Sequence, residues 1–209
     1  MKQRMLKLGF RIPAVLAALL LTGCGGLIEL PNSGPAPSLY NLTAAQVSGT
    51  AYAASSQLLL AEPSAGGGLD SNRIARRPSA TELQFFAGAR WSERLPRMIE
   101  GLFVEALEEA GAKVSTTRDA AGVPADYRIQ VEIRDFQAEY FDGALVPDIR
   151  VRINVRIIRL GPLKIVAAKA FEAHIPSAGA QIPSIIDSFD QATSDVVGQS
   201  ISWIAETLE

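Results

Sequence analysis

The sequence predicts an α/β protein built as a single α-β sandwich, with two long helices packed against a mixed, mostly antiparallel sheet. A signal peptide and a flexible tether precede it. Three segments in the second half of the chain alternate apolar and polar residues, which is the period of a strand with one buried face. Two other segments carry apolar residues at helical spacing. The chain has 209 residues and no internal repeat, which fits one domain with an N-terminal extension.

Residues 1–23 have the composition of an export signal. Four basic residues stand within the first eleven positions, and an apolar run at 12–21 follows them. That run is about ten residues long, too short for a helix to span the roughly 30 Å core of a bilayer. We therefore expect a cleavable signal peptide whose positive end is held at the cytosolic face.

The signal closes with Leu21-Thr22-Gly23-Cys24, which resembles the bacterial lipobox. In that motif the thiol is alkylated by diacylglycerol and the chain is cut just before it. An inert cysteine in an ordinary signal peptide is the alternative, but the signal, the small residues and the sole cysteine all coincide here. We expect Cys24 to be the lipidation site and the first mature residue, carrying three acyl chains. Gly25 follows it in place of an inner-membrane retention aspartate, which favours the outer membrane, facing the periplasm.

Residues 24–38 are rich in glycine and proline and show no periodicity, so they are interpreted as a flexible tether. The folded domain is expected over residues 39–209. Its first half contains short apolar segments at 39–42 and 57–61 that are typical of strands, and the pair 72–77 and 82–86 predicts a hairpin. The glycine-rich segment between these strands, 64–68, is expected to be a flexible turn because it lacks the features of a phosphate-binding loop.

Two helices are expected from apolar residues at helical spacing. The first follows Ser92 as N-cap, has Pro96 near its start and ends at Gly111. The second is the long C-terminal segment from Ile182 to Leu208.

Three strands are expected in the second half, at 127–133, 149–157 and 163–175. The phase breaks at Phe136, which predicts a β-bulge near Arg134. The third strand carries small apolar residues on its outer side and is therefore expected to lie centrally in the sheet.

A row of arginines on these strands is the candidate partner-docking face. With one side of the sheet open, they would meet an acidic partner or lipid head groups. Internal cross-strand pairing with Glu132 and Glu172 is the favoured alternative, since arginine is common on open strands. The candidate docking residues are Arg128, Arg134, Arg150, Arg152 and Arg156.

The composition argues against several function classes. Without the signal's basic residues the chain holds 16 basic and 22 acidic residues, a net charge of about −6, whereas nucleic-acid binding needs a positive surplus. One cysteine and one histidine, His174, exclude an internal disulfide and a zinc site built from Cys and His. His174 has no Gly-x-Ser-x-Gly partner motif and is interpreted as a surface residue. We therefore expect no enzyme, with no catalytic residues, metal or cofactor.

Four segments together resemble the ABC-type transport auxiliary lipoproteins, the family that includes the intermembrane transport lipoprotein of the paraquat-inducible operon. The resemblance runs from Tyr40 through most of the C-terminal half. Its spacing from Arg-Ile to Trp-x-x-x-Leu-Pro before an amphipathic helix is the most specific part. The segments are Leu39-Tyr40-Asn41-Leu42, 72–76, 83–96 and 127–136.

The resemblance implies an accessory role in an ABC system that carries lipids or other hydrophobic molecules between two membranes. Its partners would be a substrate-binding protein with an MCE domain and the permease and ATPase, and the family's members form homo-oligomers. The resemblance implies no catalytic residues. Two alternatives remain open: a stand-alone lipoprotein that binds a lipid or another hydrophobic ligand in an internal pocket, and a hydrolase that would depend on His174.

Overall fold

The computed structural model describes residues 36–43, 52, 55–119 and 124–208. Cys24, the signal peptide and the tether up to residue 35 lie outside these residues. The first half of the described part consists of short strands and one helix, and the second half of three long strands and a second helix. In chain order the elements are β1 (Ser38–Tyr40), β2 (Gln57–Leu60), β3 (Ser64–Ala65), η1 (Gly67–Leu69), β4 (Arg73–Ser79), β5 (Glu82–Trp91), α2 (Leu95–Glu109), β6 (Lys113–Thr116), β7 (Tyr127–Glu139), η2 (Phe141–Gly143), β8 (Asp148–Leu160), β9 (Leu163–Pro176) and α3 (Ile182–Leu208).

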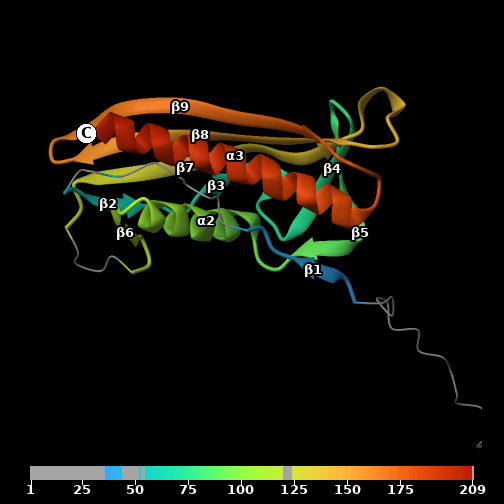
Figure 1. Cartoon of the computed structure of the whole chain (residues 1–209), viewed down its shortest axis with the longest axis horizontal. Helices are drawn as coiled ribbons and strands as arrows, with labels where there is room; N and C mark the ends of the chain where they lie inside the picture. The colour runs from blue at the N-terminus through green and yellow to red at the C-terminus, as the bar shows by residue number, and fades with distance from the viewer. Residues whose placement is uncertain (1–35, 44–51, 53–54, 120–123, 209) are drawn as a thin grey trace, which may run out of the picture. The chain divides into compact units, whose positions relative to one another are not determined.

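The sheet is organised around β7, its best-paired strand. Along one edge, successive parts of β7 pair in parallel with β2, β3 and β4. Along the other edge β8 pairs antiparallel over nearly the whole of β7, and β9 pairs antiparallel with β8 (Figure 1). The sheet is completed by β6 beside β2, and by β5 and β1 beyond β4. The mixed sheet and the α/β fold class predicted from the sequence are confirmed, and the two longest ladders are antiparallel.

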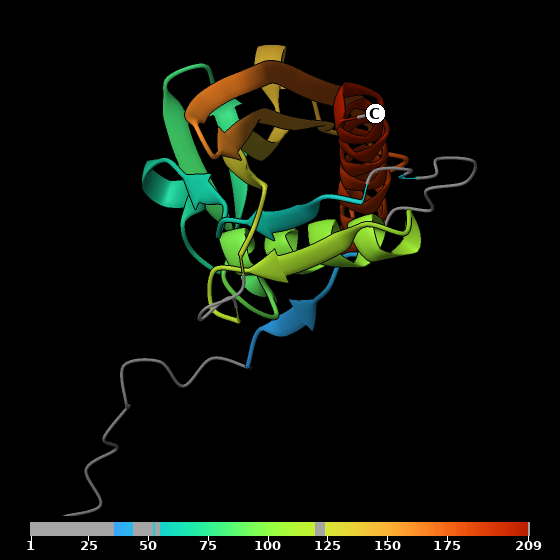
Figure 2. The same ribbon diagram turned by 90° about the vertical axis from the view of Figure 1, so that its left-hand side faces the viewer.

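Helix α3 runs alongside β8 and β9, and α2 lies alongside β6 and contacts α3. Viewed end-on, the strands and the two helices surround a common interior (Figure 2). Apolar and polar residues alternate along β7 and β8, so each strand has an apolar side and a polar side. The apolar side faces the helices, and the polar side faces away from them. Neither helix of the described part has the length and hydropathy that a membrane span requires.

Three aromatic side chains form the centre of the core. Trp91 from β5 meets Phe136 of β7 and Phe189 of α3 edge-on, with ring centroids 5.8 and 5.4 Å apart. Phe136 and Phe189 are stacked at 5.2 Å. All three rings are fully buried, so this cluster joins the first half of the chain to the second.

The bulge predicted near Arg134 is confirmed. The register between β7 and β8 shifts between Ile133 and Asp135, which inserts one extra residue in β7. Because of that shift, Phe136 points into the core as Ile133 does, and Asp135 lies on the polar side.

The expected central position of the strand at 163–175 is wrong. Within the described part of the chain β9 pairs only with β8, so it is an edge strand. Its outer apolar residues are exposed: Ile165 is 58% and Val166 37% accessible. Small and apolar residues on both sides of a strand therefore do not require a second neighbouring strand.

The start of α2 also differs from expectation. Arg94, not Ser92, is the N-cap residue, and no side chain caps the helix. Ser92 instead donates a hydrogen bond from its hydroxyl to Asn41, next to β1. Pro96 lies in the first turn as predicted, where its missing N–H costs no hydrogen bond. Gly111 ends the helix with a φ of 85°, which a glycine adopts without strain.

The glycine-rich segment expected to be a flexible turn contains regular structure. Ser64 and Ala65 form β3 beside Glu132 and Ile133 of β7, and Gly67–Leu69 form the 3-10 turn η1. Because β3 pairs with β7 over two residues only, no periodic pattern in the sequence marks it.

Candidate docking face on the sheet

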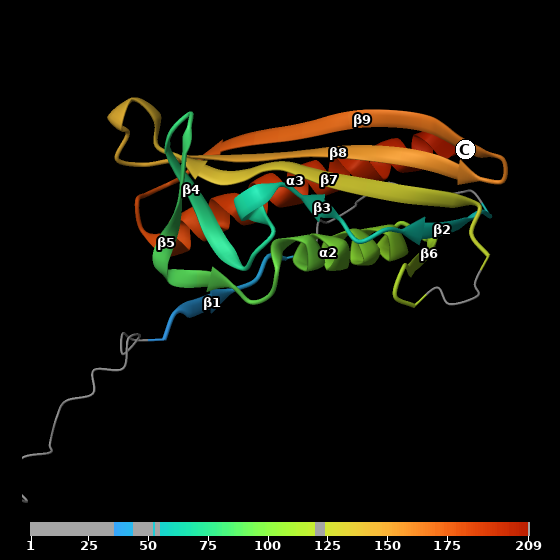
Figure 3. The ribbon, with the colours of Figure 1, turned by 180° about the vertical axis from the view of Figure 1, so that it is seen from behind.

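Figure 3 shows β7, β8 and β9 from the side that faces away from α3. By their register, most of the charged residues of these strands lie on that side. We call it the charged face. Three predicted arginines, Arg150, Arg152 and Arg156, alternate along β8 and all lie on it. Arg134 lies next to them at the bulge of β7, and Arg128 lies on the same side nearer the start of β7. The structure thus brings the predicted row together on one side of the sheet.

Glu132 is the first acidic partner in this row. It accepts a hydrogen bond from Arg134 at 2.9 Å and lies 3.7 Å from a guanidinium nitrogen of Arg156. Both arginine side chains are more than 40% exposed, so water screens these two contacts.

Asp135 forms a second and more buried node. Arg152 Nε lies 2.6 Å from its carboxylate, and Arg150 Nε lies at 3.8 Å. Behind the arginines, the Gln137 side-chain amide donates to Asp135 at 3.1 Å and to Glu139 at 3.0 Å. Asp135, Gln137 and Glu139 are all buried, so losing these hydrogen bonds would leave buried polar groups without partners.

Glu172 on β9 closes the network. Arg150 donates to it at 2.7 Å, and His174 Nε2 lies 2.9 Å from the same oxygen. Partial burial by itself raises the pKa of Glu172, but the hydrogen bonds from His174 and Arg150 outweigh it and hold that pKa below its ordinary value. His174 is therefore engaged with a carboxylate at an exposed strand position.

These contacts confirm the pairing alternative, because Glu132 and Glu172 each bind arginines of the row. Among the five arginines of the row, only Arg128 makes no ion pair with a residue that the structure describes. A docking role for this face stays a prediction. The internal pairs lower the net positive charge that a partner would meet.

A second polar site, on α2, was not singled out from the sequence. Glu100 is only 1% exposed, and its neighbours 98, 99, 102 and 103 form the buried apolar side of the helix. An acidic residue inside an apolar stripe was the signal that could have marked it. Among the described residues there is no group of three or more His, Cys, Asp and Glu side chains that could hold a metal ion.

The comparisons with known proteins agree with this architecture. The family model for the ABC-type transport auxiliary lipoprotein component matches residues 40–200. Among solved structures, protein XCC0632 from Xanthomonas campestris has a TM-score of 0.73 and 27% identity, covering 81% of this chain and 95% of that chain. The hypothetical protein CT253 from Chlamydia trachomatis has a TM-score of 0.51 and 11% identity, covering 74% and 98%. No curated protein matches the chain.

Proposed function

Because the chain belongs to the family of ABC-type transport auxiliary lipoproteins, we propose that it is a lipid-anchored docking subunit of an MCE-associated ABC system. This system carries lipids between the inner and outer membranes. The family match is the observation that carries the proposal, and it agrees with the family predicted from the sequence. The partners are an MCE-domain substrate-binding protein and the permease and ATPase of the same system.

The anchor of the proposed subunit is an acylated Cys24, which holds the domain at the periplasmic side of the outer membrane. The lipobox-like residues Leu21-Thr22-Gly23-Cys24 support it. Growth with labelled palmitate is expected to label the chain, and a Cys24→Ala variant is expected to stay unlabelled. An unlabelled native chain would contradict the anchor.

Four pockets formed by the described residues differ from a lipid-binding cavity in their lining. These open pockets have volumes between about 210 and 750 Å³ and are lined mainly by charged, polar and small side chains. A lipid tail needs an apolar lining. The interior, by contrast, is filled by large side chains such as Trp91, Phe103 and Phe136. Under the alternative of a stand-alone lipid carrier, native mass spectrometry would detect one additional lipid beyond the anchor. The docking role predicts none.

Co-purification of the full-length chain from detergent extracts tests the docking role. We expect the MCE-domain protein or the permease to be recovered with it. An Ala170→Arg variant adds a long side chain to the charged face without removing an ion pair, because Ala170 is exposed opposite Asn154. It is expected to reduce recovery, whereas Asp195→Arg on the exposed side of α3 is not. Recovery of neither component with the native chain would contradict the proposal.

A further inference from the structure

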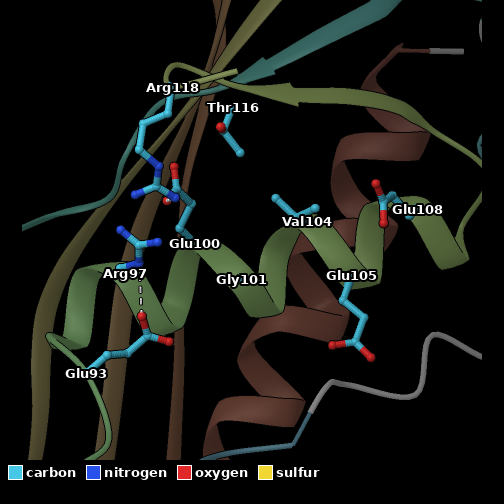
Figure 4. A pocket seen from close by; sticks show the side chains of 9 residues that line it. All are labelled: Glu93, Arg97, Glu100, Gly101, Val104, Glu105, Glu108, Thr116 and Arg118. Carbon is cyan, nitrogen blue, oxygen red and sulfur yellow. Dashed lines mark hydrogen bonds and ion pairs between the residues drawn. The ribbon is translucent and has the colours of Figure 1, made fainter. Parts of the chain in front are cut away.

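A groove of about 380 Å³ lies along the outer side of α2, between this helix and the end of β6 (Figure 4). We call it the α2 groove. Four glutamates line it against two arginines, so its lining has a surplus of negative charge. The acidic residues are Glu93, Glu100, Glu105 and Glu108, and the basic ones are Arg97 and Arg118.

Ion pairs within the groove neutralise only part of this negative charge. Arg97 in the first turn of α2 binds Glu93, which lies just before the helix, at 3.1 Å. Arg118 binds one carboxylate oxygen of Glu100. Glu105 and Glu108 form no ion pair with any residue that the structure describes. A cation that enters the groove therefore meets carboxylates whose charge is not already neutralised.

The second oxygen of Glu100 is the most informative atom of the groove. Its side chain is only 1% exposed, and Oε1 has no hydrogen-bond partner among the described residues. A carboxylate oxygen that is buried without a donor is costly, and proteins usually complete such an oxygen with a ligand, an ion or an ordered water molecule. Arg118 donates only to Oε2. Oε1 is covered in the structure, so a donor in the groove reaches it when the side chain of Glu100, which lines the groove, turns outward.

Gly101 keeps the groove open at this point. It lies in the middle of α2, where glycine is about 1 kcal/mol less favourable than alanine. A Cβ atom built on Gly101 would meet no other atom within 4 Å, so packing does not require the glycine. The helix therefore gives up stability at the one position where a side chain would project into the groove beside Glu100.

We propose that the α2 groove is a docking site for an arginine side chain of a partner protein, whose guanidinium donates to the free oxygen of Glu100. A guanidinium fits because its planar fork donates to two acceptors at once, and Glu105 and Glu108 extend the acidic lining along the same helix. This site lies on α2, away from the charged face of β7, β8 and β9. It does not depend on which transport system the protein serves.

A peptide titration of the full-length chain in nonionic detergent tests the site. The probe is a short, capped, fluorescently labelled peptide with one central arginine, followed by fluorescence anisotropy. The matched control peptide carries citrulline, which keeps the shape of arginine and lacks its charge. We expect saturable binding of the arginine peptide that weakens with added salt, and at least tenfold weaker binding of the citrulline peptide.

Two variants separate the site from folding effects. Glu100→Gln keeps the shape of the side chain and removes its charge. It is expected to weaken the binding of the arginine peptide by about tenfold or more. Gly101→Leu fills the groove with a residue of high helix propensity and is expected to abolish binding while the fold is kept. Glu109→Gln, on the same helix but outside the groove, is the control and is expected to bind as the native chain does.

The proposal is overturned if the arginine and citrulline peptides bind equally, if no saturable binding occurs, or if Glu100→Gln binds as tightly as the native chain. Each of these results is independent of the co-purification experiment. A failure of the site and a failure of the proposed transport role are therefore distinguishable.

Discussion

Glu172 on the charged face and Glu100 in the α2 groove are two carboxylates that each bind an arginine, yet their surroundings shift their pKa values in opposite directions. Burial would raise the pKa of Glu172, but hydrogen bonds from His174 and Arg150 lower it. Burial raises the pKa of Glu100, and the attraction and hydrogen bond of Arg118 offset this only in part. Glu172 is 35% exposed, whereas Glu100 is 1% exposed.

The two regions differ in how far their charges are paired with one another. On the charged face most arginines and carboxylates form ion pairs with one another, which helps to hold β7, β8 and β9 together. Asp135 Oδ2 and the Nε atoms of Arg128 and Arg152 nevertheless have no hydrogen-bond partner among the described residues. In the α2 groove a buried carboxylate keeps one oxygen without a partner in the described residues. The ion pairs of the charged face contribute to folding, whereas the unpaired oxygen of Glu100 belongs to a residue that lines a groove, where a ligand can complete it.

The largest expected effect tests whether the charged face is structural. Asp135→Ala removes the acceptor of Arg152 and Gln137 and is expected to lower the free energy of unfolding by about 2 kcal/mol, since buried donors lose their partner. Urea denaturation measures this. Asp195→Ala, at an exposed position of α3, is the control and is expected to change stability by less than about 0.5 kcal/mol. Equal effects of the two substitutions would mean that the network contributes nothing to folding.

The pH dependence of stability tests the contrast itself. Glu100 has a raised pKa, so its contribution to stability is present below the unfolded-state value of about 4.3 and is lost as pH rises through the folded-state pKa. Glu172 has a lowered pKa, so its contribution is present above that value and is lost as pH falls through the folded-state pKa. The charges that face Glu100 are Arg118, Arg97 and Glu62.

Unfolding free energies of Glu100→Gln and Glu172→Gln, each compared with the native chain, are therefore expected to change in opposite directions. As pH rises from about 4 to 7, Glu100→Gln gains stability relative to the native chain and Glu172→Gln loses it. Glu172 is partly exposed, so we expect Glu172→Gln to lower the free energy of unfolding by only about 0.5 kcal/mol, which is usual for such ion pairs. Parallel slopes for the two variants would remove the distinction between the two regions.

Gly101→Ala tests whether the fold itself requires the glycine beside the α2 groove. Alanine has the higher helix propensity and its Cβ meets no neighbour, so the unfolding free energy is expected to rise by about 0.5 to 1 kcal/mol. Gly198→Ala in α3 is the matched control, because its Cβ also meets no atom within 4 Å. A decrease in thermal stability for Gly101→Ala alone would show that the glycine is needed by the fold.

The smallest effect is expected for Arg156→Ala. Its guanidinium lies 3.7 Å from Glu132 and the arginine side chain is 43% exposed. Such a pair contributes little, so we expect a change in unfolding free energy below about 0.5 kcal/mol. A loss of several times this amount, measured by urea denaturation, would mean that Arg156 holds the sheet more firmly than its contacts indicate.

The long strands and helices could be predicted from the sequence because their periodicity is local. The alternation in β7 and β8, the phase break at Phe136 and the apolar stripe of α3 each appear within a single segment. The parallel pairing of β2, β3 and β4 with β7 depends on contacts between distant parts of the chain, so it leaves no such pattern. The edge position of β9 was missed for the same reason.

The arginine row and the α2 groove likewise differ in how far the sequence predicts them. The arginine row follows from strand parity and was predicted residue by residue, and its acidic partners Glu132 and Glu172 were named as the alternative. The groove depends on Arg118, which reaches Glu100 from the end of β6 through tertiary packing. Helical spacing places Glu100 among apolar residues but does not show which of its oxygens lacks a partner.

Site-specific photocrosslinking in living cells tests the docking role most directly. A photoreactive amino acid at Ala170 stands on the charged face without disturbing an ion pair, and one at Asp195 on the exposed side of α3 serves as the control. The account predicts a crosslink from position 170 to the MCE-domain protein or the permease and none from position 195. Absence of any crosslink to these components from position 170, with the chain present at the membrane at its normal level, would contradict it.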